Sequence, residues 1–383
     1  MDRLGFPVVG VVGGGQLARM MAPAAIGLGI ELRVLARDAQ DGAALVVPKT
    51  SIGAEDDLDA LRAFAAGCDV LTFDHEHVPT GHLRTLQAEG VVVRPGPEAL
   101  EHAQDKLVMR RRLTALGVPC PRWAEVTDAA QLQGFGDEVG WPLVLKTPRG
   151  GYDGKGVRLV EHPHDADDWL AGAGARGAPL LAEERVAFSR ELAVLVARSP
   201  HRQAAVWPVV ETVQVDGVCR EVVAPAAISE EHALAAQQAA LRIADGLDVT
   251  GVLAVEMFDT DRGVLVNELA MRPHNSGHWT IEGSRTSQFE QHLRAVLDLP
   301  LGDTAMTAPH VVMANVLGGD YTDMYAGYLH CLAHDPGVRI HMYGKEVRPG
   351  RKVGHVTTLG GDAEDVRGRA RHAAAFLRGD IDG

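Results

Sequence analysis

The first hundred residues alternate short apolar runs with segments of helical periodicity, and this alternation constrains the fold more than any other feature of the chain. The apolar runs predict strands at residues 8–12, 32–35, 70–73 and 91–93. The segments between them predict helices at residues 16–27, 57–65 and 81–88. Because strands that alternate with helices build a doubly wound parallel sheet, we predict an α/β domain at the N-terminus.

The pattern changes after a proline-rich connector at residues 94–97 and a predicted helix from residue 104 toward residue 116. Antiparallel strand pairs are predicted at residues 191–197 with 203–208 and at 253–258 with 264–269, with a long helix at 230–247 between them. This is the α+β pattern. The residues after 300 predict a smaller unit with a hairpin at 339–343. The predicted domains are residues 1–103, 104–300 and 301–383.

The charge balance limits the partners that the chain can have. Lys and Arg number 37 against 51 Asp and Glu, which gives a formal net charge of −14. Because such a molecule repels polyanions, we expect no nucleic-acid partner. A phosphorylated ligand therefore has to be met by a local group of cations or by backbone N–H groups.

The cysteines and the apolar segments indicate the compartment. The four cysteines lie far apart and include no C-x-x-C pair, which is typical of reduced thiols in the cytosol. No apolar run approaches the length of about 18 residues that a membrane-spanning helix needs. The apolar start at residues 7–12 has no plausible cleavage site. We therefore expect a cytoplasmic protein without a membrane partner.

A glycine-rich turn, Gly13-Gly14-Gly15, follows the first predicted strand and precedes a helix at Gln16 and Leu17. Backbone N–H groups at such a helix start can bind a phosphate or a carboxylate. The alternative is a tight strand-to-helix turn with no ligand. The spacing differs from G-x-G-x-x-G, which disfavours a dinucleotide site.

A second glycine-rich segment is more specific. Lys146 ends an apolar strand, and the following loop at residues 147–156 contains four glycines. A lysine beside a loop of this kind suits a flap that closes over nucleotide phosphates and excludes water. A solvated hairpin tip would explain the glycines but not the lysine.

Two carboxylates, Glu256 and Glu268, lie on strands that a short turn joins. Strand pairing that keeps both on one face places them nearly opposite each other, where they repel unless a cation lies between them. Mg²⁺ suits this arrangement because it takes carboxylate and phosphate oxygens. Two solvated acids are the alternative, but both strands are otherwise apolar.

A third acidic group, Glu183 and Glu184 followed by Val186, comes after an apolar pair, and Glu191 lies eight residues beyond Glu183. A hinge strand here could offer backbone groups to an adenine edge and a carboxylate to ribose hydroxyls. A solvated charged face explains the same residues equally well.

Four cations lie within eight residues near the C-terminus, interrupted by a proline and a glycine: Lys345, Arg348, Arg351 and Lys352. In so acidic a chain a substrate phosphate needs a local cationic group of this kind. A solvated basic turn is the alternative.

In their order along the chain, these motifs resemble those of the ATP-grasp ligases, and most closely those of the N5-carboxyaminoimidazole ribonucleotide synthase family. The resemblance covers nearly the whole chain. It is carried by GGGQLARM at 13–20, HEHV at 75–78, QDK at 104–106, GGYDGKG at 150–156, NELAMRPHNSGHWT at 267–280, TSQFEQHLRA at 286–295 and YGKEVRPGRKVGHVT at 343–357. The stretches at 272–278 and 344–355 discriminate best, because other ATP-grasp ligases share the metal-binding acids but not these segments.

The resemblance implies an ATP-grasp fold with an N-terminal doubly wound parallel-sheet domain, an ATP-grasp domain with a mobile glycine-rich flap, and a small C-terminal domain. It implies an ATP-dependent carbon–nitrogen ligase of purine biosynthesis. Such an enzyme joins bicarbonate to the amine of 5-aminoimidazole ribonucleotide through carboxyphosphate, with release of ADP and phosphate. The implied partners are ATP, bicarbonate, the ribonucleotide and a second copy of the chain, and the implied cofactor is Mg²⁺.

The resemblance also implies site residues. Those for ATP are Lys106, Lys146, Gly151, Tyr152, Asp153, Gly154, Lys155, Gly156, Glu183, Glu184, Val186, Glu191, Asn267 and Glu268. Those for the ribonucleotide are Gln16, Leu17, Glu76, Asn275, Lys345, Arg351 and Lys352. The metal would be held by Glu256 and Glu268. Arg272 is expected to hold bicarbonate and stabilise carboxyphosphate, while Asp153 and Tyr152 orient the amine.

Two positions depart from the family pattern. The family usually has Glu where this chain has Asp74, and often has His where it has Gln214, so neither residue is assigned a role. His274 and His278 could act as bases, but packed or hydrogen-bonded histidines are commoner, and both roles stay open.

Other functions are weighed against these residues. A formate-dependent glycinamide ribonucleotide transformylase has the same domain order, but that family tends to have Glu at the position of Gln16 and Asp at the position of Asn275. The two amides favour an uncharged substrate amine. A regulatory nucleotide-binding protein would not need Lys146 together with both metal acids, and the glycine spacing disfavours a dehydrogenase.

Overall fold

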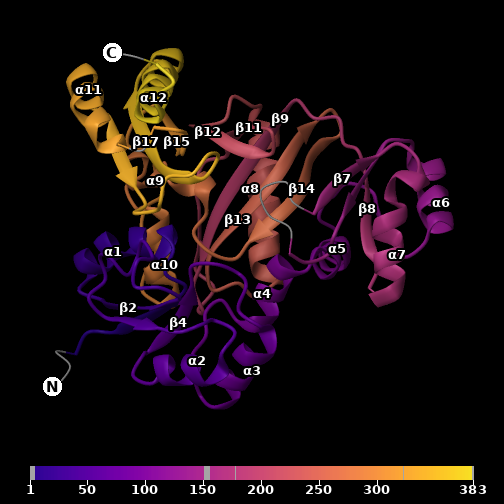
Figure 1. The fold of residues 1–383 in the computed structure, drawn as a ribbon, viewed down its shortest axis with the longest axis horizontal. Helices are drawn as coiled ribbons and strands as arrows, with labels where there is room; N and C mark the ends of the chain where they lie inside the picture. Colours follow the sequence, from indigo (N-terminus) through magenta and orange to yellow (C-terminus); the bar gives the residue numbers. More distant parts are fainter. Residues whose placement is uncertain (1–4, 151–155, 177, 322, 382–383) are drawn as a thin grey trace.

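The computed structural model describes residues 5–150, 156–176, 178–321 and 323–381, with backbone only for 174–176. Its N-terminal part is a four-stranded parallel sheet in the order β3-β2-β1-β4, with helices packed on it (Figure 1). The strands are β1 Val8–Val12, β2 Glu31–Ala36, β3 Thr50–Ile52 and β4 Val70–Phe73. The helices are α1 Gln16–Leu28, α2 Leu58–Ala65 and α3 Thr80–Ala88. The α/β prediction is confirmed.

One predicted strand of this sheet is wrong. Residues 91–93 form no strand, and Val93 makes only an isolated bridge to Leu71. The fourth strand is instead β3, whose residues are half-buried or exposed at the sheet edge. An edge strand of this kind needs no apolar run, so the hydrophobic pattern does not reveal it.

The predicted helix through residue 104 is two helices, α4 Pro97–Gln104 and α5 Lys106–Ala115. Asp105 between them has extended backbone angles, and its carboxylate accepts hydrogen bonds from the N–H groups of Leu107 and Val108. Such an N-cap starts a new helix. Lys106 is consequently the first residue of α5.

A second, small sheet carries the base of the glycine-rich loop. Its antiparallel strands lie in the order β5-β8-β6-β7, and two helices, α6 Ala129–Val139 and α7 Asp167–Arg176, cover it. The strands are β5 Trp123–Val126, β6 Leu143–Lys146, β7 Val157–Val160 and β8 Leu180–Glu184.

The largest sheet has nine strands in the order β14-β13-β9-β11-β12-β15-β17-β16, with β10 paired to β9. Its strands are β9 Arg190–Arg198, β10 Ala204–Val206, β11 Val210–Val215, β12 Val218–Ala224, β13 Gly251–Thr260, β14 Gly263–Ala270, β15 His310–Leu317, β16 Arg339–Met342 and β17 Lys352–Gly360. Its helices are α8 Glu230–Gly246, α9 Thr280–Gly283, α10 Gln288–Val296, α11 Gly327–His334 and α12 Ala363–Arg378. Short 3-10 turns are η1 Pro163–Ala166, η2 Asn275–Gly277 and η3 Met324–Ala326.

The strands after residue 300 extend this sheet and do not build one of their own. Antiparallel pairing of β12 with β15, from Glu221 opposite Ala314 to Ala224 opposite Val311, joins them to it. The predicted appended unit therefore shares its sheet with the preceding residues.

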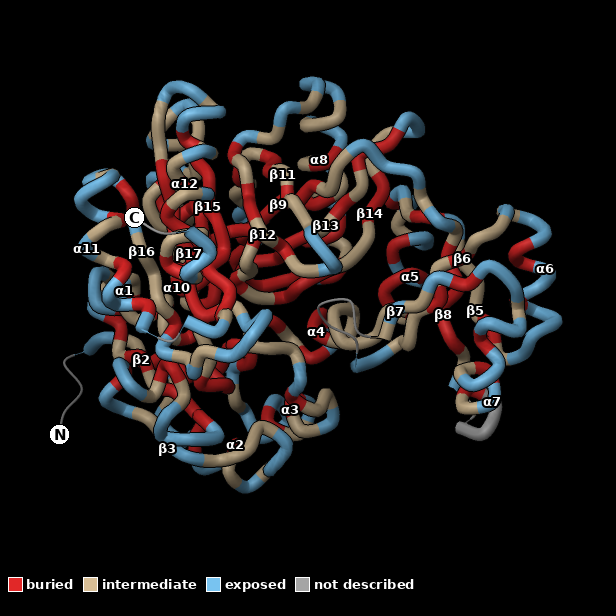
Figure 2. The backbone as a smooth tube through the Cα atoms, turned by 45° about the horizontal axis from the view of Figure 1, so that its top comes forward, coloured by how far each residue is buried: buried red, intermediate tan, exposed pale blue. Residues whose placement is uncertain are grey.

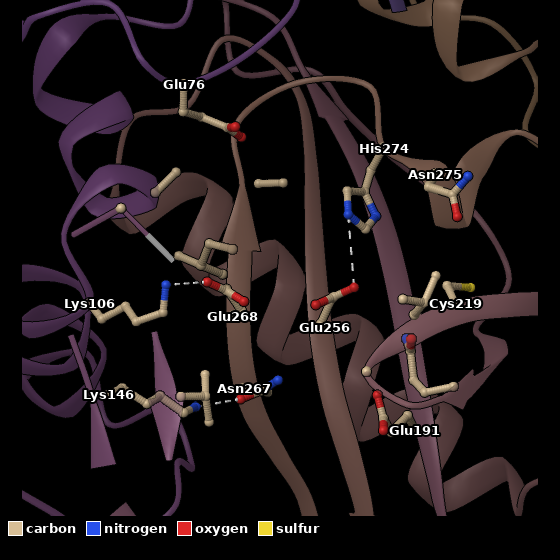
Figure 3. A pocket seen from close by; sticks show the side chains of 18 of the residues that line it. Glu76, Lys106, Lys146, Glu191, Cys219, Glu256, Asn267, Glu268, His274 and Asn275 are labelled. Carbon is tan, nitrogen blue, oxygen red and sulfur yellow. Dashed lines mark hydrogen bonds and ion pairs between the residues drawn. The ribbon is translucent and has the colours of Figure 1, made fainter. Parts of the chain in front are cut away.

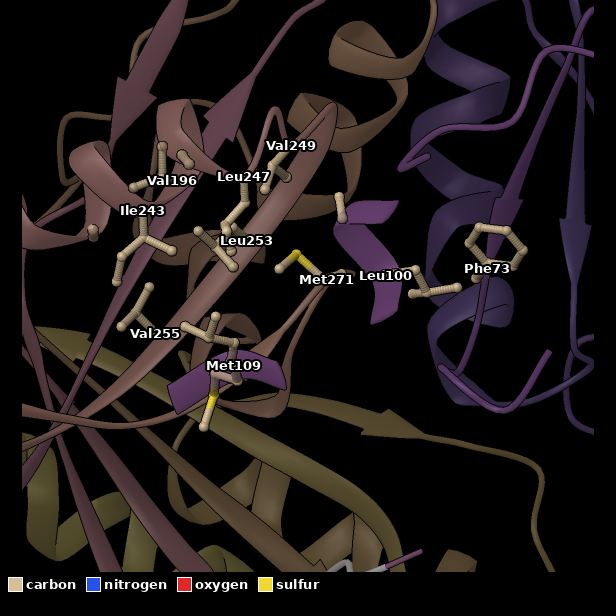
Figure 4. Packing of buried hydrophobic residues seen from close by; sticks show 14 of the residues in the cluster. Phe73, Leu100, Met109, Val196, Ile243, Leu247, Val249, Leu253, Val255 and Met271 are labelled. Atoms are coloured by element: carbon tan, nitrogen blue, oxygen red, sulfur yellow. The ribbon is translucent and has the colours of Figure 1, made fainter. Parts of the chain in front are cut away.

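Buried residues concentrate on the strands and on the helix faces that cover them (Figure 2). One hydrophobic cluster runs from Phe73 on β4 through Leu100 on α4 to Met271 after β14 and Val255 on β13 (Figure 4). The parallel sheet and the large antiparallel sheet thus share one hydrophobic core, and this core holds the two sheets together.

Candidate active site

A cavity of about 2390 Å³ collects the residues that the sequence singles out from distant segments. Its walls include Gln16 and Glu76 from the N-terminal α/β part, Lys106 and Lys146 from the middle of the chain, and Lys345 from the C-terminal part. Among the described residues, no helix is long and apolar enough to cross a membrane.

The start of α1 is occupied by the protein's own carboxylate. Asp74 accepts hydrogen bonds from the N–H groups of Gly15 (3.0 Å) and Ala18 (2.7 Å). A side chain at Gly15 would meet this carboxylate, since a Cβ there would lie 2.2 Å from its oxygen. The N–H groups of Gly15 and Ala18 are therefore satisfied within the chain, which at this helix start favours the alternative of a tight turn without a ligand. Gln16 and Leu17 still line the cavity.

Lys146 reaches the cavity from the end of β6 and is held by two acceptors, of which Figure 3 shows Asn267. Its Nζ lies 2.6 Å from Oε2 of Glu183 and donates to Oδ1 of Asn267 at 3.1 Å. Glu183 is only 3% exposed, and its other oxygen accepts from Arg110. Its carboxylate is thus committed to two cations, so the backbone of Glu183 rather than its side chain is what remains to meet adenosine.

Lys106 and Glu268 form a second ion pair across the cavity, with Nζ 2.6 Å from Oε1 (Figure 3). Lys106 is held at the first turn of α5, and Glu268 lies on β14. The two predicted phosphate-binding lysines therefore lie beside Asn267 and Glu268, neighbours on one strand.

Glu256 lies directly opposite Glu268 in the pairing of β13 with β14, as the sequence predicts. Burial raises the pKa of Glu256 to about 7, and the charges of Glu268 and Glu191 act in the same direction. The Nε2 atom of His274 lies 3.8 Å from Glu256 Oε1, and the charges of Lys352 and Arg272 oppose the shift only in part.

An under-compensated carboxylate facing a second one fits a divalent cation. Among the described residues, no cluster of three or more His, Cys, Asp or Glu is arranged to hold a metal. Two acids alone suit Mg²⁺, which usually takes one or two carboxylates and completes its shell with phosphate oxygens and water. Glu256 and Glu268 are thus the residues that could hold it.

The acidic group around residues 183–191 lines one end of the cavity. Glu184 is bound to Arg262 (2.8 Å) and to the N–H of Arg122 (2.9 Å), whereas Val186 is half-buried on the wall. Burial raises the pKa of Glu191, although a hydrogen bond with Gln214 opposes this shift. Glu191 is therefore the carboxylate of this group that has no cationic partner among the described ion pairs.

Arg272 is held by Glu76, which comes from the loop after β4. Its Nε donates to Glu76 Oε2 at 2.7 Å, and Met271 N–H donates to the other oxygen. Gln104 holds that loop through the carbonyls of Glu76 and Val78, both at 2.8 Å. Glu76 therefore orients Arg272 at the cavity wall.

The two candidate bases are both neutral near pH 7. Burial, with the nearby charges of Arg272 and Lys352, lowers the pKa of His274 to about 3, and burial also lowers that of His278. His274 lines the cavity, but His278 does not. Asn275 faces it and exchanges amide hydrogen bonds with Asn315 at 2.9 and 2.8 Å.

The basic turn reaches the same cavity as the lysines of the middle domain. Lys345, Arg348, Arg351 and Lys352 all line it. Arg348 is exposed and pairs with Glu346. Residues 151–155, which include Tyr152 and Asp153, lie outside the described part of the chain, but Gly156 accepts a hydrogen bond from Thr147 N–H at the base of their loop.

Sequence reasoning missed three side chains that shape the site. Phe188 and Phe258 stack on the cavity wall with ring centroids 4.7 Å apart, and Arg110 lies behind Lys146. Arg110 is four residues after Lys106, hence on the same helix face. That spacing could have indicated Arg110 as a residue of the site, but the three successive arginines at 110–112 are also typical of a solvated helix surface.

This arrangement is typical of the ATP-dependent ligases of the ATP-grasp class. It combines a lysine at a strand end before a glycine-rich loop, a second lysine at a helix start and two facing carboxylates. Family models agree along the chain. A ribonucleotide synthetase preATP-grasp domain matches residues 7–104, an ATP-grasp domain matches 111–289, and a phosphoribosylaminoimidazole carboxylase C-terminal domain matches 311–369.

Whole-chain comparisons narrow this class. N5-carboxyaminoimidazole ribonucleotide synthase from Mycobacterium tuberculosis is 56% identical over 97% of this chain and 88% of the relative, and that from Corynebacterium ammoniagenes is 48% identical over 97% and 92%. The Aspergillus clavatus enzyme, solved with ADP and 5-aminoimidazole ribonucleotide, has a TM-score of 0.87 at 33% identity and covers 98% of this chain and 99% of its own. The Thermus thermophilus structure has a TM-score of 0.86 at 38% identity, over 98% and 99%. The chain belongs to the N5-carboxyaminoimidazole ribonucleotide synthase family.

Proposed function

We propose that this ligase joins bicarbonate to the exocyclic amine of 5-aminoimidazole ribonucleotide at the expense of ATP, in purine biosynthesis. The observation that carries the proposal is the common cavity. It brings the facing pair Glu256 and Glu268, the lysines 106 and 146 and the basic turn at 345–352 to one space. A nucleotide triphosphate and a second phosphorylated substrate can therefore meet there.

Bicarbonate is a poor electrophile, so ATP has to activate it. A bicarbonate oxygen attacks the γ-phosphorus, the bond to ADP breaks, and carboxyphosphate forms. The amine then attacks its carbonyl carbon, phosphate leaves, and one amine proton is released as the carbamate forms. The contribution of the protein is charge neutralisation and alignment.

Several side chains share this task. Lys106 and Lys146 hold the ATP phosphates, and Glu256 with Glu268 would hold Mg²⁺, which would neutralise phosphate charge. Arg272, fixed by Glu76, binds bicarbonate and the carboxyphosphate that it becomes. Because the pKa of His274 is lowered to about 3, it can accept a hydrogen bond near pH 7 but adds no charge.

The adenosine end is assigned to the residues beside the hinge. Val186 and the backbone of Glu183 and Glu184 face the adenine, and Glu191 with its hydrogen-bond partner Gln214 takes the ribose hydroxyls. The stacked Phe188 and Phe258 form an apolar wall that suits a base.

The ribonucleotide lies across the domains on the other side. Gln16, Leu17 and Asn275 face its base and amine, whereas Lys345, Arg351 and Lys352 take its phosphate. Two amides beside the amine favour an uncharged nucleophile, as an aminoimidazole has. Glycinamide ribonucleotide, with its cationic amine, fits less well.

The loop at 150–156 completes the proposal as a flap. Gly151, Gly154, Lys155 and Gly156 close over the phosphates, and Tyr152 and Asp153 orient the amine. Exclusion of water matters because carboxyphosphate hydrolyses. Residues 1–103 then serve the ribonucleotide, 104–300 ATP, and 301–383 the substrate phosphate, in a cytoplasmic homodimer.

The test is phosphate release from ATP with a panel of acceptors. We expect release only with bicarbonate and 5-aminoimidazole ribonucleotide together, in a one-to-one ratio with carboxylated product. Formate with glycinamide ribonucleotide serves as the matched alternative pair. Release with that pair, and none with the first, would contradict the proposal.

A further inference from the structure

Arg110 lies behind the ATP side of the cavity and is not among its lining residues. Its side chain is fully buried, with 0% exposed. Nε donates to Oε1 of Glu183 at 2.5 Å, and Nη2 donates to the backbone carbonyl of Asn267 at 2.7 Å. One guanidinium therefore bonds to two different strands.

The same two partners hold Lys146. Glu183 offers its second oxygen to Lys146 Nζ at 2.6 Å, and the side-chain oxygen of Asn267 accepts from the same nitrogen at 3.1 Å. The contacts close a ring through Arg110, Glu183, Lys146 and Asn267. Its members come from α5, β8, β6 and β14, so the ring joins the small sheet to the large one.

The electrostatics make Arg110 more than a filler of space. Burial alone would raise the pKa of Glu183, but the charges of Arg110 and Lys146 and the hydrogen bonds from both outweigh burial and lower it to about 2. Glu183 is thus ionised at any physiological pH. Without Arg110, the buried carboxylate of Glu183 would be compensated by Lys146 alone. It would then hold the ammonium of Lys146 back from the cavity.

The guanidinium has the shape for this task. Its donors form a rigid planar fork, so Nε and Nη2 reach Glu183 and Asn267 at once. A lysine ammonium is a compact charge on a flexible stem, and it cannot span both acceptors with the same geometry.

We propose that Arg110 is a positioning residue of the ATP site: it fixes Glu183 and Asn267 so that they hold the ammonium of Lys146 toward the phosphates and keep the flap-bearing sheet in register with β14. The proposal rests on the role of Lys146 in ATP binding given above. Arg110 itself touches no substrate.

The first experiment compares Arg110→Lys with Arg198→Lys. Arg198 is a matched control because it is equally buried (3% exposed), donates to the carbonyl of Val249, pairs with acids and lies outside the cavity lining. We expect Arg110→Lys to raise the KM for ATP at least tenfold and to leave the KM for the ribonucleotide within twofold. Arg198→Lys should change neither KM by more than twofold, even where both variants lose thermal stability alike.

Lys146→Ala separates this inference from the proposed function. A KM for ATP unchanged in Lys146→Ala would remove Lys146 from the ATP site. A raised KM in Lys146→Ala beside an unchanged KM in Arg110→Lys would overturn only the role of Arg110. Equal changes of both KM values in Arg110→Lys would also overturn it, because they indicate a general structural defect.

A second variant covers the case in which Arg110→Lys does not fold. Arg110→Met combined with Glu183→Gln removes both buried charges together, and such replacement is often tolerated. Lys146 then loses its ionic partner, and Asn267, its remaining acceptor, is no longer fixed by Arg110, so the KM for ATP should again rise at least tenfold while that for the ribonucleotide stays within twofold. A KM for ATP within twofold of the parent would overturn the proposal.

Discussion

Glu256 faces a second carboxylate across the strands β13 and β14, and its pKa is raised to about 7, first by burial. Between about pH 4.5 and 7 the folded protein therefore binds a proton that the unfolded chain has lost. Stability of the metal-free protein falls as the pH rises through this window. The residue that suits Mg²⁺ best thus costs stability when no cation is present.

Glu256→Gln should consequently abolish turnover and yet stabilise the metal-free protein at pH 8. We expect a gain of about 1–2 kcal/mol, below the full conversion of 1.36 kcal/mol per pKa unit because the side chain is 30% exposed. Denaturant unfolding at pH 8 and at pH 5 measures it. The gain should be much smaller at pH 5 and should vanish only below about pH 4.5, where the unfolded chain also binds the proton.

Glu268→Gln is the control, because its carboxylate is already paired with Lys106. It should also abolish turnover but bring no gain in stability. Magnesium-dependent activity that survives in either variant, or equal stabilisation by both, would contradict the assignment of the metal acids.

For single residues, the sequence predicts contacts between paired neighbouring strands. It does not predict a contact whose partner lies far away along the chain. The opposition of Glu256 and Glu268 follows from strand alternation. That Asp74 fills the start of α1, 59 residues from Gly15, does not. Nor does the sequence show that Glu183 is committed to Arg110 and Lys146, since three elements have to meet first.

Among the elements, α5 depends on one side chain for its start. Asp105 caps the helix and pairs with Arg149, and the cap fixes the direction from which Lys106 enters the cavity. The apolar pattern runs across the break, so the sequence predicts one helix where the structure has two. Capping residues rather than hydrophobic periodicity set such boundaries.

Asp105→Ala should lower stability by about 1 kcal/mol, as loss of an N-cap usually does, and raise the KM for ATP severalfold. Asp128→Ala is the matched control, because Asp128 caps α6 in the same way away from the cavity. It should lower stability by a similar amount without changing the KM. Thermal unfolding and steady-state kinetics are measured on both variants. If Asp128→Ala raised the KM for ATP as much as Asp105→Ala does, the cap of α5 would have no specific role in positioning Lys106.

The role of the basic turn at residues 345–352 is tested by comparing the KM values for the two substrates. Loss of one charge-assisted hydrogen bond to a phosphate costs about 1.5–3 kcal/mol, or roughly ten- to a hundredfold in affinity. Arg351→Ala and Lys352→Ala should raise the KM for the ribonucleotide by that order and leave the KM for ATP nearly unchanged. Arg339→Ala, an exposed cation on β16 outside the cavity lining, should alter neither.

These measurements need a fixed ionic strength, because surface charge effects depend on salt. Equal effects of Arg351→Ala on both substrates would indicate misfolding. If neither KM changed, the basic turn would be a solvated surface without a role in binding.

In the whole molecule, one sheet and one core join what the sequence separates. Residues 301–383 continue the sheet of the preceding residues through β12 and β15, and the cluster from Phe73 to Met271 ties the parallel sheet to it. Local patterns predict which segments form strands but not which sheet they enter, because distant pairing decides that. The sequence therefore predicts most elements and the class of site, but not this continuity.

The proposed mechanism requires the site to close before chemistry, because carboxyphosphate would otherwise be exposed to water. Asp153→Ala should leave ATP binding nearly intact while less of the ATP cleaved leads to carboxylated product. The ratio of product to released phosphate measures this coupling. An unchanged ratio at an unchanged rate would remove Asp153 from the site.

If ATP activates bicarbonate for transfer to the amine, one oxygen of bicarbonate must end on the phosphate that is released. With ¹⁸O-labelled bicarbonate, ATP and 5-aminoimidazole ribonucleotide, the oxygen that attacks the γ-phosphorus remains on the phosphate when carboxyphosphate breaks down. Mass spectrometry should therefore find one labelled oxygen in each phosphate released, with equal amounts of carboxylated product and ADP. Unlabelled phosphate would exclude attack of bicarbonate on ATP, and labelled phosphate without carboxylated product would exclude transfer to the amine.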